Sequence, residues 1–171
     1  MQHRRQKVRD SMKKVQVLRW IVLVCLVIFV GQYLIVPKDS TTPFKTVVKD
    51  SVKDVTVSDY TVQENRNIRR FLSLDPSTYQ HIRYYKNKDT MQSSEIVIVQ
   101  FKSDDQADDF KQAMQKHVDD QIKIFDGYLP KEADLLKQCK IVTQANYGIY
   151  VTNKKADTVV NNWQQSLKKG D

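Results

Sequence analysis

The feature that most constrains this chain is a long apolar run near its N-terminus. Residues 20–36 read WIVLVCLVIFVGQYLIV, and up to Val30 only the indole of Trp20 and the thiol of Cys25 can hydrogen-bond outward. A helix over this run extends roughly 25 Å, which is within the range of a membrane span. The run therefore predicts a transmembrane helix. Its predicted anchor residues are Trp20, Ile21, Leu23, Leu26, Phe29, Tyr33 and Val36.

The charges that flank the run predict its orientation. Residues 1–19 carry seven basic side chains and one acid, Asp10. Such a basic excess stays on the cytoplasmic side. We therefore expect a single-pass protein of the cell membrane, held in the bilayer by residues 20–36, with its N-terminus cytoplasmic and its C-terminal domain extracytoplasmic. A cleaved secretory signal is the alternative, but the downstream edge from Gln32 to Pro37 lacks the small residues that cleavage needs.

The remainder of the chain predicts one folded domain. About 130 residues follow the run, the usual size of a domain with its own core. We expect a basic tail over 1–19, the span over 20–36, a proline-bounded linker over 37–43 and the domain over 44–171. Of the 28 basic and 20 acidic residues, 21 and 19 follow residue 19, which leaves only +2 of the net charge of +8. A nucleic-acid partner is therefore not expected.

Hydrophobic periodicity predicts an α+β fold. The pattern strand, strand, helix occurs twice, over 81–125 and 139–168, and amphipathic helices are expected over 44–54 and 131–138. The motifs Thr61-Val62-Gln63-Glu64 and Ser103 with Gln106 have the form of capping boxes. Residues 96–99 are apolar on both faces, as in a central strand. We expect an antiparallel four-stranded sheet with helices packed on one face.

Three motifs in this region resemble a known family. They are SEIVIVQFKSDDQADDF at 94–110, Tyr128-Leu129-Pro130, and Gly148-Ile149-Tyr150-Val151. From Phe44 onward the chain resembles bacterial domain-of-unknown-function family 4358, found in Gram-positive species on secreted, lipid-anchored or single-span proteins. The resemblance implies an extracytoplasmic location and no activity, because none is established for the family. Many members carry a lipid-anchor cysteine where this chain has the apolar run.

The candidate catalytic groups are few. After residue 36 the only thiol is Cys139 and the only imidazoles are His81 and His117. A dyad of Cys139 with either histidine would make a cell-envelope hydrolase, but Cys139 lacks the glycine or tight-turn context of an exposed nucleophile. A buried thiol is the more common outcome for an unpaired cysteine. No catalytic residue is predicted, and pairing of Cys139 between two chains stays open, as does the oligomeric state.

Metal and cofactor sites are not predicted. Asp104, Asp105, Asp108 and Asp109 cluster at a helix start, where the helix dipole favours acids. Calcium sites use loops with a bidentate acid, and no such pattern occurs here. Zinc would need more than two scattered histidines and one cysteine. Phosphate-binding and dinucleotide-binding glycine motifs are also missing from the sequence.

Tyrosines give the remaining indication of a ligand site. Tyrosine combines an apolar ring with a polar hydroxyl and is frequent at binding surfaces, although it also packs well in half-buried sheets. We therefore predict a non-catalytic domain that binds an envelope protein or cell-wall ligand, and the rival prediction is the hydrolase. The candidate ligand face comprises Tyr84, Tyr128, Pro130, Gly148 and Tyr150.

Overall fold

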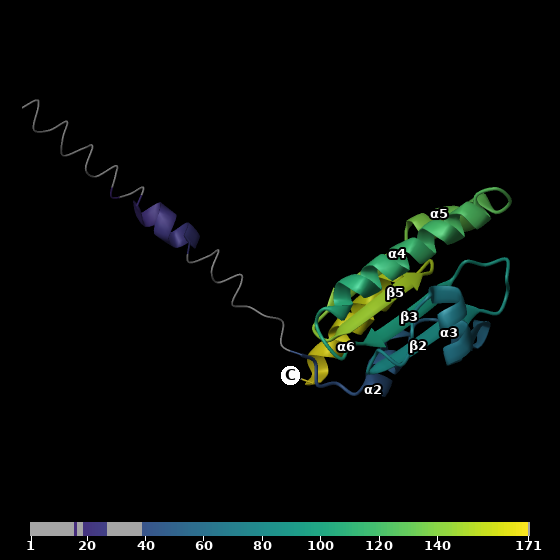
Figure 1. The fold of residues 1–171 in the computed structure, drawn as a ribbon, viewed down its shortest axis with the longest axis horizontal. Helices are drawn as coiled ribbons and strands as arrows, with labels where there is room; N and C mark the ends of the chain where they lie inside the picture. The colour runs from purple at the N-terminus through teal and green to yellow at the C-terminus, as the bar shows by residue number, and fades with distance from the viewer. Residues whose placement is uncertain (1–15, 17–18, 27–38, 171) are drawn as a thin grey trace, which may run out of the picture. The chain divides into compact units, whose positions relative to one another are not determined.

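The structure is a computed structural model that describes residues 16, 19–26 and 39–170 (Figure 1). The chain divides into two compact units, residues 1–38 and the folded domain that begins at Asp39. The domain's helices are α2 (Phe44–Ser51), α3 (Asn65–Leu72), α4 (Gln106–Phe125), α5 (Pro130–Lys137) and α6 (Ala156–Leu167). Its strands are β1 (Tyr60–Val62), β2 (His81–Asn87), β3 (Glu95–Gln100), β4 (Lys140–Gln144) and β5 (Tyr147–Thr152).

The predicted membrane topology is contradicted by the structure. Residues 19–26 are helical. Across the part of the chain that is described, no helix is both long and apolar enough to cross a membrane. This finding contradicts the predicted single-pass location with a cytoplasmic N-terminus. Among the predicted anchor residues, Phe29, Tyr33 and Val36 lie outside the described residues.

The sheet has five antiparallel strands, in the order β1-β2-β3-β5-β4, rather than the predicted four. The additional strand is β1, which pairs Thr61 with Lys86. Its three residues are too few to show a strand period. The two predicted strand-strand-helix units are present as β2-β3-α4 and β4-β5-α6.

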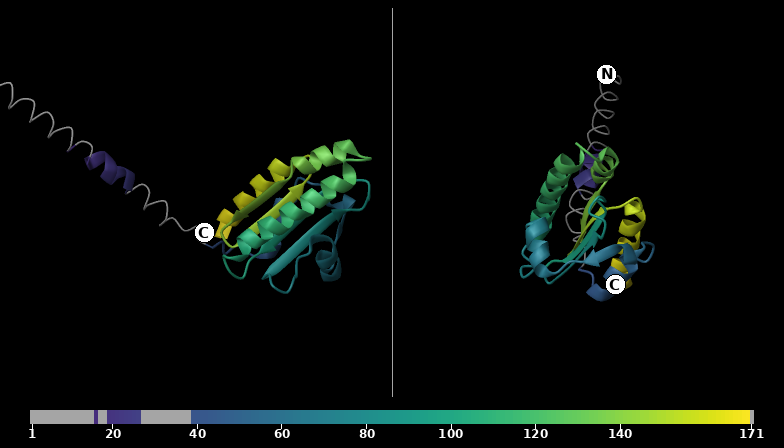
Figure 2. Two further views of the ribbon diagram at one scale, coloured as in Figure 1. Left: turned by 45° about the horizontal axis from the view of Figure 1, so that its top comes forward. Right: turned by 90° about the vertical axis from the view of Figure 1, so that its right-hand side faces the viewer.

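Helices cover both faces of the sheet, whereas one covered face was expected (Figure 2). Successive residues of a strand point to opposite faces. Val97 and Val99 of β3 join a core cluster with α3, α4 and α5. Ile96 and Ile98 join a second cluster with α2 and α6. A strand that is apolar on both sides requires a helical layer on each side, so the one-layer prediction was wrong.

Neither predicted capping box forms. Thr61 belongs to β1, and α3 begins after Glu64, which makes no side-chain capping bond. At the start of α4, the side-chain oxygen of Gln106 accepts a hydrogen bond from the backbone of Lys102 instead of from the Ser103 backbone. The residues of the first predicted capping box, 61–64, begin in β1, where their backbone pairs with β2 instead of starting a helix.

The segment 39–43 is fastened to the far end of the domain. The Ser40 hydroxyl donates to the carbonyl of Leu167 (2.6 Å), and the Thr42 hydroxyl donates to the carbonyl of Ser166 (2.9 Å). The Tyr147 hydroxyl donates to the carbonyl of Thr42 (2.9 Å). Ser40 and Thr42 are buried. The two ends of the folded domain are therefore held side by side.

We predict that Gly148→Ala destabilises the domain. A Cβ at this position would lie 2.8 Å from the Phe101 ring and 2.9 Å from the Phe110 ring. Overpacking of this kind costs about 1–3 kcal/mol. Urea unfolding followed by circular dichroism measures the change. Gly127→Ala is the matched control, because nothing lies within 4 Å of the added Cβ there; equal effects of the two variants would contradict the prediction.

Candidate functional site

A carboxylate is buried at the centre of the domain. Glu95, at the start of β3, is 2% exposed. Its Oε1 accepts hydrogen bonds from the Tyr84 hydroxyl (2.7 Å) and from the Lys86 ammonium on β2. Its Oε2 lies 2.7 Å from Nε2 of His117 on α4. We call Tyr84, Lys86, Glu95 and His117 the Glu95 cluster.

The cluster holds the Glu95 carboxylate in its charged form. Burial by itself raises the pKa of Glu95, but the hydrogen bonds and charges of His117 and Lys86 outweigh burial, so this pKa lies below its ordinary value. Burial and the adjacent carboxylate raise the pKa of Tyr84. A buried carboxylate is tolerated in a protein only when it is paired in this way.

Packing closes the Glu95 cluster to ligands. The His117 side chain is 4% exposed, and its ring packs edge-on against Tyr150, with centroids 5.8 Å apart. The Tyr150 hydroxyl accepts a hydrogen bond from Thr152 (2.7 Å). The cluster thus joins β2, β3 and α4, and only its Lys86 side chain is partly exposed. Sequence reasoning missed it, although a glutamate that opens an otherwise apolar strand is the signal that could have revealed it.

The candidate catalytic groups are not brought together as a dyad. Nε2 of His117 faces Glu95, and the exposed His81 lies against Phe44, with ring centroids 5.1 Å apart. Within residues 39–170, no hydrogen bond joins Cys139 to either imidazole. Burial, with a contribution from Asp119, raises the pKa of the Cys139 thiol. A raised pKa disfavours the thiolate that nucleophilic catalysis needs.

The residues of the predicted ligand face do not form one exposed surface, because some are buried and others are exposed. Tyr84 and Tyr150 are fully buried in the core, and Gly148 lies beneath the rings of Phe101 and Phe110. Tyr128 is 52% exposed in the turn after α4, and Pro130 is exposed at the start of α5. The face was expected either on a sheet surface free of helices or at the loop 128–130. The second helical layer covers the sheet surface, and Tyr128 and Pro130 of the loop are exposed.

A groove with an apolar floor lies between α2 and β2. It encloses about 560 Å³, and its apolar residues come from both elements. On α2, Phe44 and Val48 are one turn apart, and Val52 continues this spacing just past the helix end. From β2, Tyr85 faces the same side. This α2–β2 groove is lined by Phe44, Lys45, Val48, Lys49, Val52, Lys53, Val55, Val57, Arg83 and Tyr85.

The rim of the groove carries only positive charge. Its four charged residues are Lys45, Lys49, Lys53 and Arg83, and its lining includes no acid. None of the four has an ion-pair partner among the described residues. The three lysines recur every fourth residue, so they form a row along one side of the groove.

The acids of the same segment are directed elsewhere. Asp50 accepts a hydrogen bond from Lys169 (2.8 Å), which holds the pKa of Asp50 below its ordinary value. Asp54 accepts a hydrogen bond from the amide of Asn162 on α6 (2.8 Å). The acids therefore stabilise the packing of the α2 segment on α6, and the lysines remain available at the groove.

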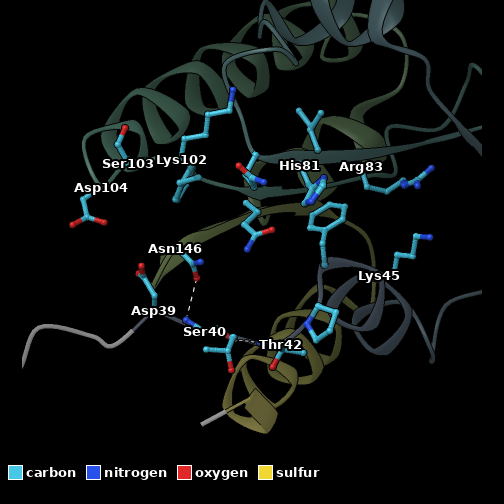
Figure 3. A pocket seen from close by; sticks show the side chains of 17 residues that line it. Asp39, Ser40, Thr42, Lys45, His81, Arg83, Lys102, Ser103, Asp104 and Asn146 are labelled. Carbon is cyan, nitrogen blue, oxygen red and sulfur yellow. Dashed lines mark hydrogen bonds between the residues drawn. The ribbon is translucent and has the colours of Figure 1, made fainter.

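A polar cleft adjoins the groove (Figure 3). It encloses about 800 Å³ between segment 39–45, the start of β2 and the loop after β3, and it shares Phe44, Lys45 and Arg83 with the groove. The cleft carries charges of both signs, because Asp39 and Asp104 line it together with cationic side chains. Figure 3 shows Lys45 and Arg83 at the same side of the cleft, with Asp104 at the opposite side.

The described residues contain no group of three or more His, Cys, Asp or Glu that could hold a metal ion. The fold and its surfaces thus define an α+β domain with a closed polar centre and an open cationic groove. The chain belongs to the family described as domain of unknown function (DUF4358), whose model matches residues 53–153. Comparison with curated proteins and with solved structures finds no significant match.

The region matched by the family model contains the whole Glu95 cluster but only part of the α2–β2 groove. The Glu95 cluster lies wholly inside residues 53–153, as do Arg83 and Tyr85 of the groove. Helix α2, with Lys45 and Lys49, precedes the matched region. The groove is therefore built jointly by the family region and by the segment before it.

We predict that Glu95→Ala strongly destabilises the domain at neutral pH. Removing one member of a buried ion pair costs about 3–5 kcal/mol, because the remaining charges lose their partner. Urea unfolding measures the loss, and Glu64→Gln, at an exposed position, is the control. A Glu95→Ala variant as stable as the unaltered chain would contradict the structural role of the cluster.

The same cluster predicts a pH dependence. Because folding lowers the pKa of Glu95, its stabilisation is fully present above the unfolded value of about 4.5 and is lost as the pH falls through the folded value. The unaltered chain should therefore lose more stability on acidification than Glu95→Gln does. Unfolding midpoints at about pH 7 and about pH 3 test this, and parallel losses would contradict it.

Proposed function

We propose that this domain is a non-catalytic binding module whose α2–β2 groove binds an acidic polypeptide segment that also carries apolar side chains. The observation that supports the proposal is the combination of an apolar floor with four cations and no acid around it. An apolar floor favours burial of aliphatic side chains, and a cationic rim selects carboxylates beside them.

The unpaired charges strengthen the argument for a partner. In the described chain, Lys86, Lys111, Lys116, Lys123, Lys137, Lys140 and Lys169 each lie within 4.0 Å of a carboxylate. The groove lysines have no such neighbour among the described residues, which is also true of Lys88, Lys102, Lys131, Lys154, Lys155 and Lys168. The groove differs in that its cations gather around one apolar recess, whereas Asp50 and Asp54 of the same segment are bound to α6. A partner that brings its own acids would complete these pairs, and the resulting attraction would speed association and weaken with salt.

Val57 supports the apolar part of the ligand. Its side chain lines the groove and is 39% exposed, whereas the side chains of Val48 and Val52 are less than a tenth exposed. A ligand side chain placed against Val57 would remove apolar surface from water on both molecules. A polypeptide with apolar residues therefore suits the groove better than a uniformly charged polymer does.

We predict that only a peptide with both features binds the full chain. Three fluorescent peptides of equal length are compared by anisotropy: one of leucine and glutamate, one with serine for leucine, and one with glutamine for glutamate. The leucine–glutamate peptide should bind, and its affinity should fall as salt rises. If the serine peptide or dextran sulfate binds equally tightly, the groove is a general anion surface and the proposal is wrong.

Charge reversal identifies the surface. Lys45→Glu with Lys49→Glu should weaken binding of the leucine–glutamate peptide by at least about tenfold, since two attractive charges become repulsive. Lys111→Glu with Lys116→Glu, on the exposed side of α4, is the matched control for net charge and should have little effect. Equal losses in the two double variants would show that net charge, and not the groove, determines binding.

A further inference from the structure

Arg83 occupies the point where the α2–β2 groove and the polar cleft meet. It lies on β2 between His81 and Tyr85, and because alternate strand residues share a face, all three are directed toward the α2 side. Arg83 lines both recesses, as do Phe44 and Lys45. In Figure 3 its guanidinium extends to the same side of the cleft as the Lys45 ammonium.

The Nε atom of Arg83 is buried without a hydrogen-bond acceptor. Buried polar atoms are nearly always paired in folded proteins, and an unpaired donor on a charged group is especially costly. In the described residues one other buried side-chain atom lacks a partner, Nε1 of Trp163. Trp163, on α6, is fully buried in the second core cluster, where no ligand reaches it. Arg83, in contrast, lines both recesses, although its Nε is buried.

The surroundings of Arg83 indicate which hydrogen-bond acceptor would suit its guanidinium group. Among the described residues no carboxylate lies within ion-pair distance of Arg83. The planar guanidinium fork binds a carboxylate through two parallel hydrogen bonds. Because Nε itself is buried, the terminal Nη1 and Nη2 atoms are the donors that a ligand carboxylate can reach. The ammonium of Lys45 would add a second positive charge. Arg83 and Lys45 thus place two cationic side chains where the two recesses meet.

We propose that Arg83 binds a ligand carboxylate in a two-pronged hydrogen-bonded pair, at the junction of the groove and the cleft. This inference rests on the proposed function, because the carboxylate belongs to the polypeptide in the groove. The carboxylate is either that of a Glu or Asp side chain or that of the peptide C-terminus. Both present the same planar pair of oxygen atoms to the guanidinium.

The test is a double-mutant cycle with the full chain and the leucine–glutamate peptide. The protein variants are Arg83→Lys, which keeps the charge but removes the fork, and Arg83→Gln. The peptide variants replace one glutamate at a time with glutamine, and a further variant amidates the C-terminus. Arg66→Lys, on the exposed face of α3, is the matched control. Urea unfolding verifies that each variant folds.

We expect Arg83→Lys to weaken binding by about tenfold and Arg66→Lys to leave it unchanged. One peptide variant should lose affinity for the unaltered chain but lose none further on Arg83→Lys. If that variant is a glutamine peptide, the partner is a side chain; if it is the amide, the partner is the C-terminus. The Arg83 Nε–H signal in a nitrogen–proton NMR spectrum should also shift on peptide binding.

The outcomes separate this inference from the proposed function. Additive losses for every pair of variants, or an Arg83→Lys chain that binds as tightly as the unaltered one, would overturn the role of Arg83 while the groove remained the binding surface. If the unaltered chain binds no peptide, the proposed function fails and this inference fails with it.

Discussion

The architecture depends on β3 being apolar on both of its faces. Residues 96–99 are all buried, with alternate side chains in opposite core clusters. A sheet with such a central strand cannot leave one face in water, so helices must be supplied to both sides. The groove follows from this arrangement, because α2 packs beside α6 and leaves the outer side chains of β2 partly uncovered next to it.

The Glu95 cluster is the polar exception within this apolar centre. Glu95 pairs through the sheet with Lys86 on β2, and its carboxylate reaches His117 on α4. A charge that is paired on both sides tolerates little displacement, because a shifted register would bury it without partners. We interpret the cluster as a determinant of strand register and helix position. It therefore contributes to the fold on which the groove depends, without contacting the groove.

Sequence periodicity predicted the parts of the fold in which a pattern extends over several turns or residues. The long helix α4 and both strand pairs are of this kind. Strand β1 was missed because three residues show no period, and its Thr61 also fitted a capping motif. A second helical layer was not predicted, although residues 96–99 are apolar on both faces and such a strand needs cover on each side.

The candidate site was harder to predict for a different reason. A tyrosine is equally compatible with a surface and with a core that accepts its hydroxyl, and Glu95 and Thr152 supply the partners for Tyr84 and Tyr150. Thr152 is two residues from Tyr150, but Glu95 comes close to Tyr84 only through the pairing of β2 with β3. The lysine spacing of the groove was visible, but only the structure shows that Asp50 and Asp54 are bound to α6 and leave the lysines unpaired.

The attachment of segment 39–43 to the end of α6 has a mechanical consequence. Tension that enters through the residues before Asp39 meets first the hydrogen bonds of Ser40 and Thr42 with Leu167 and Ser166. The same segment is also attached to the β4–β5 turn, because the Ser40 backbone donates a hydrogen bond to Asn146 and the Tyr147 hydroxyl donates one to Thr42. Extension would therefore have to break these side-chain bonds before it detached the segment. Because Phe44 and Lys45 follow directly, such a load would also reach the groove.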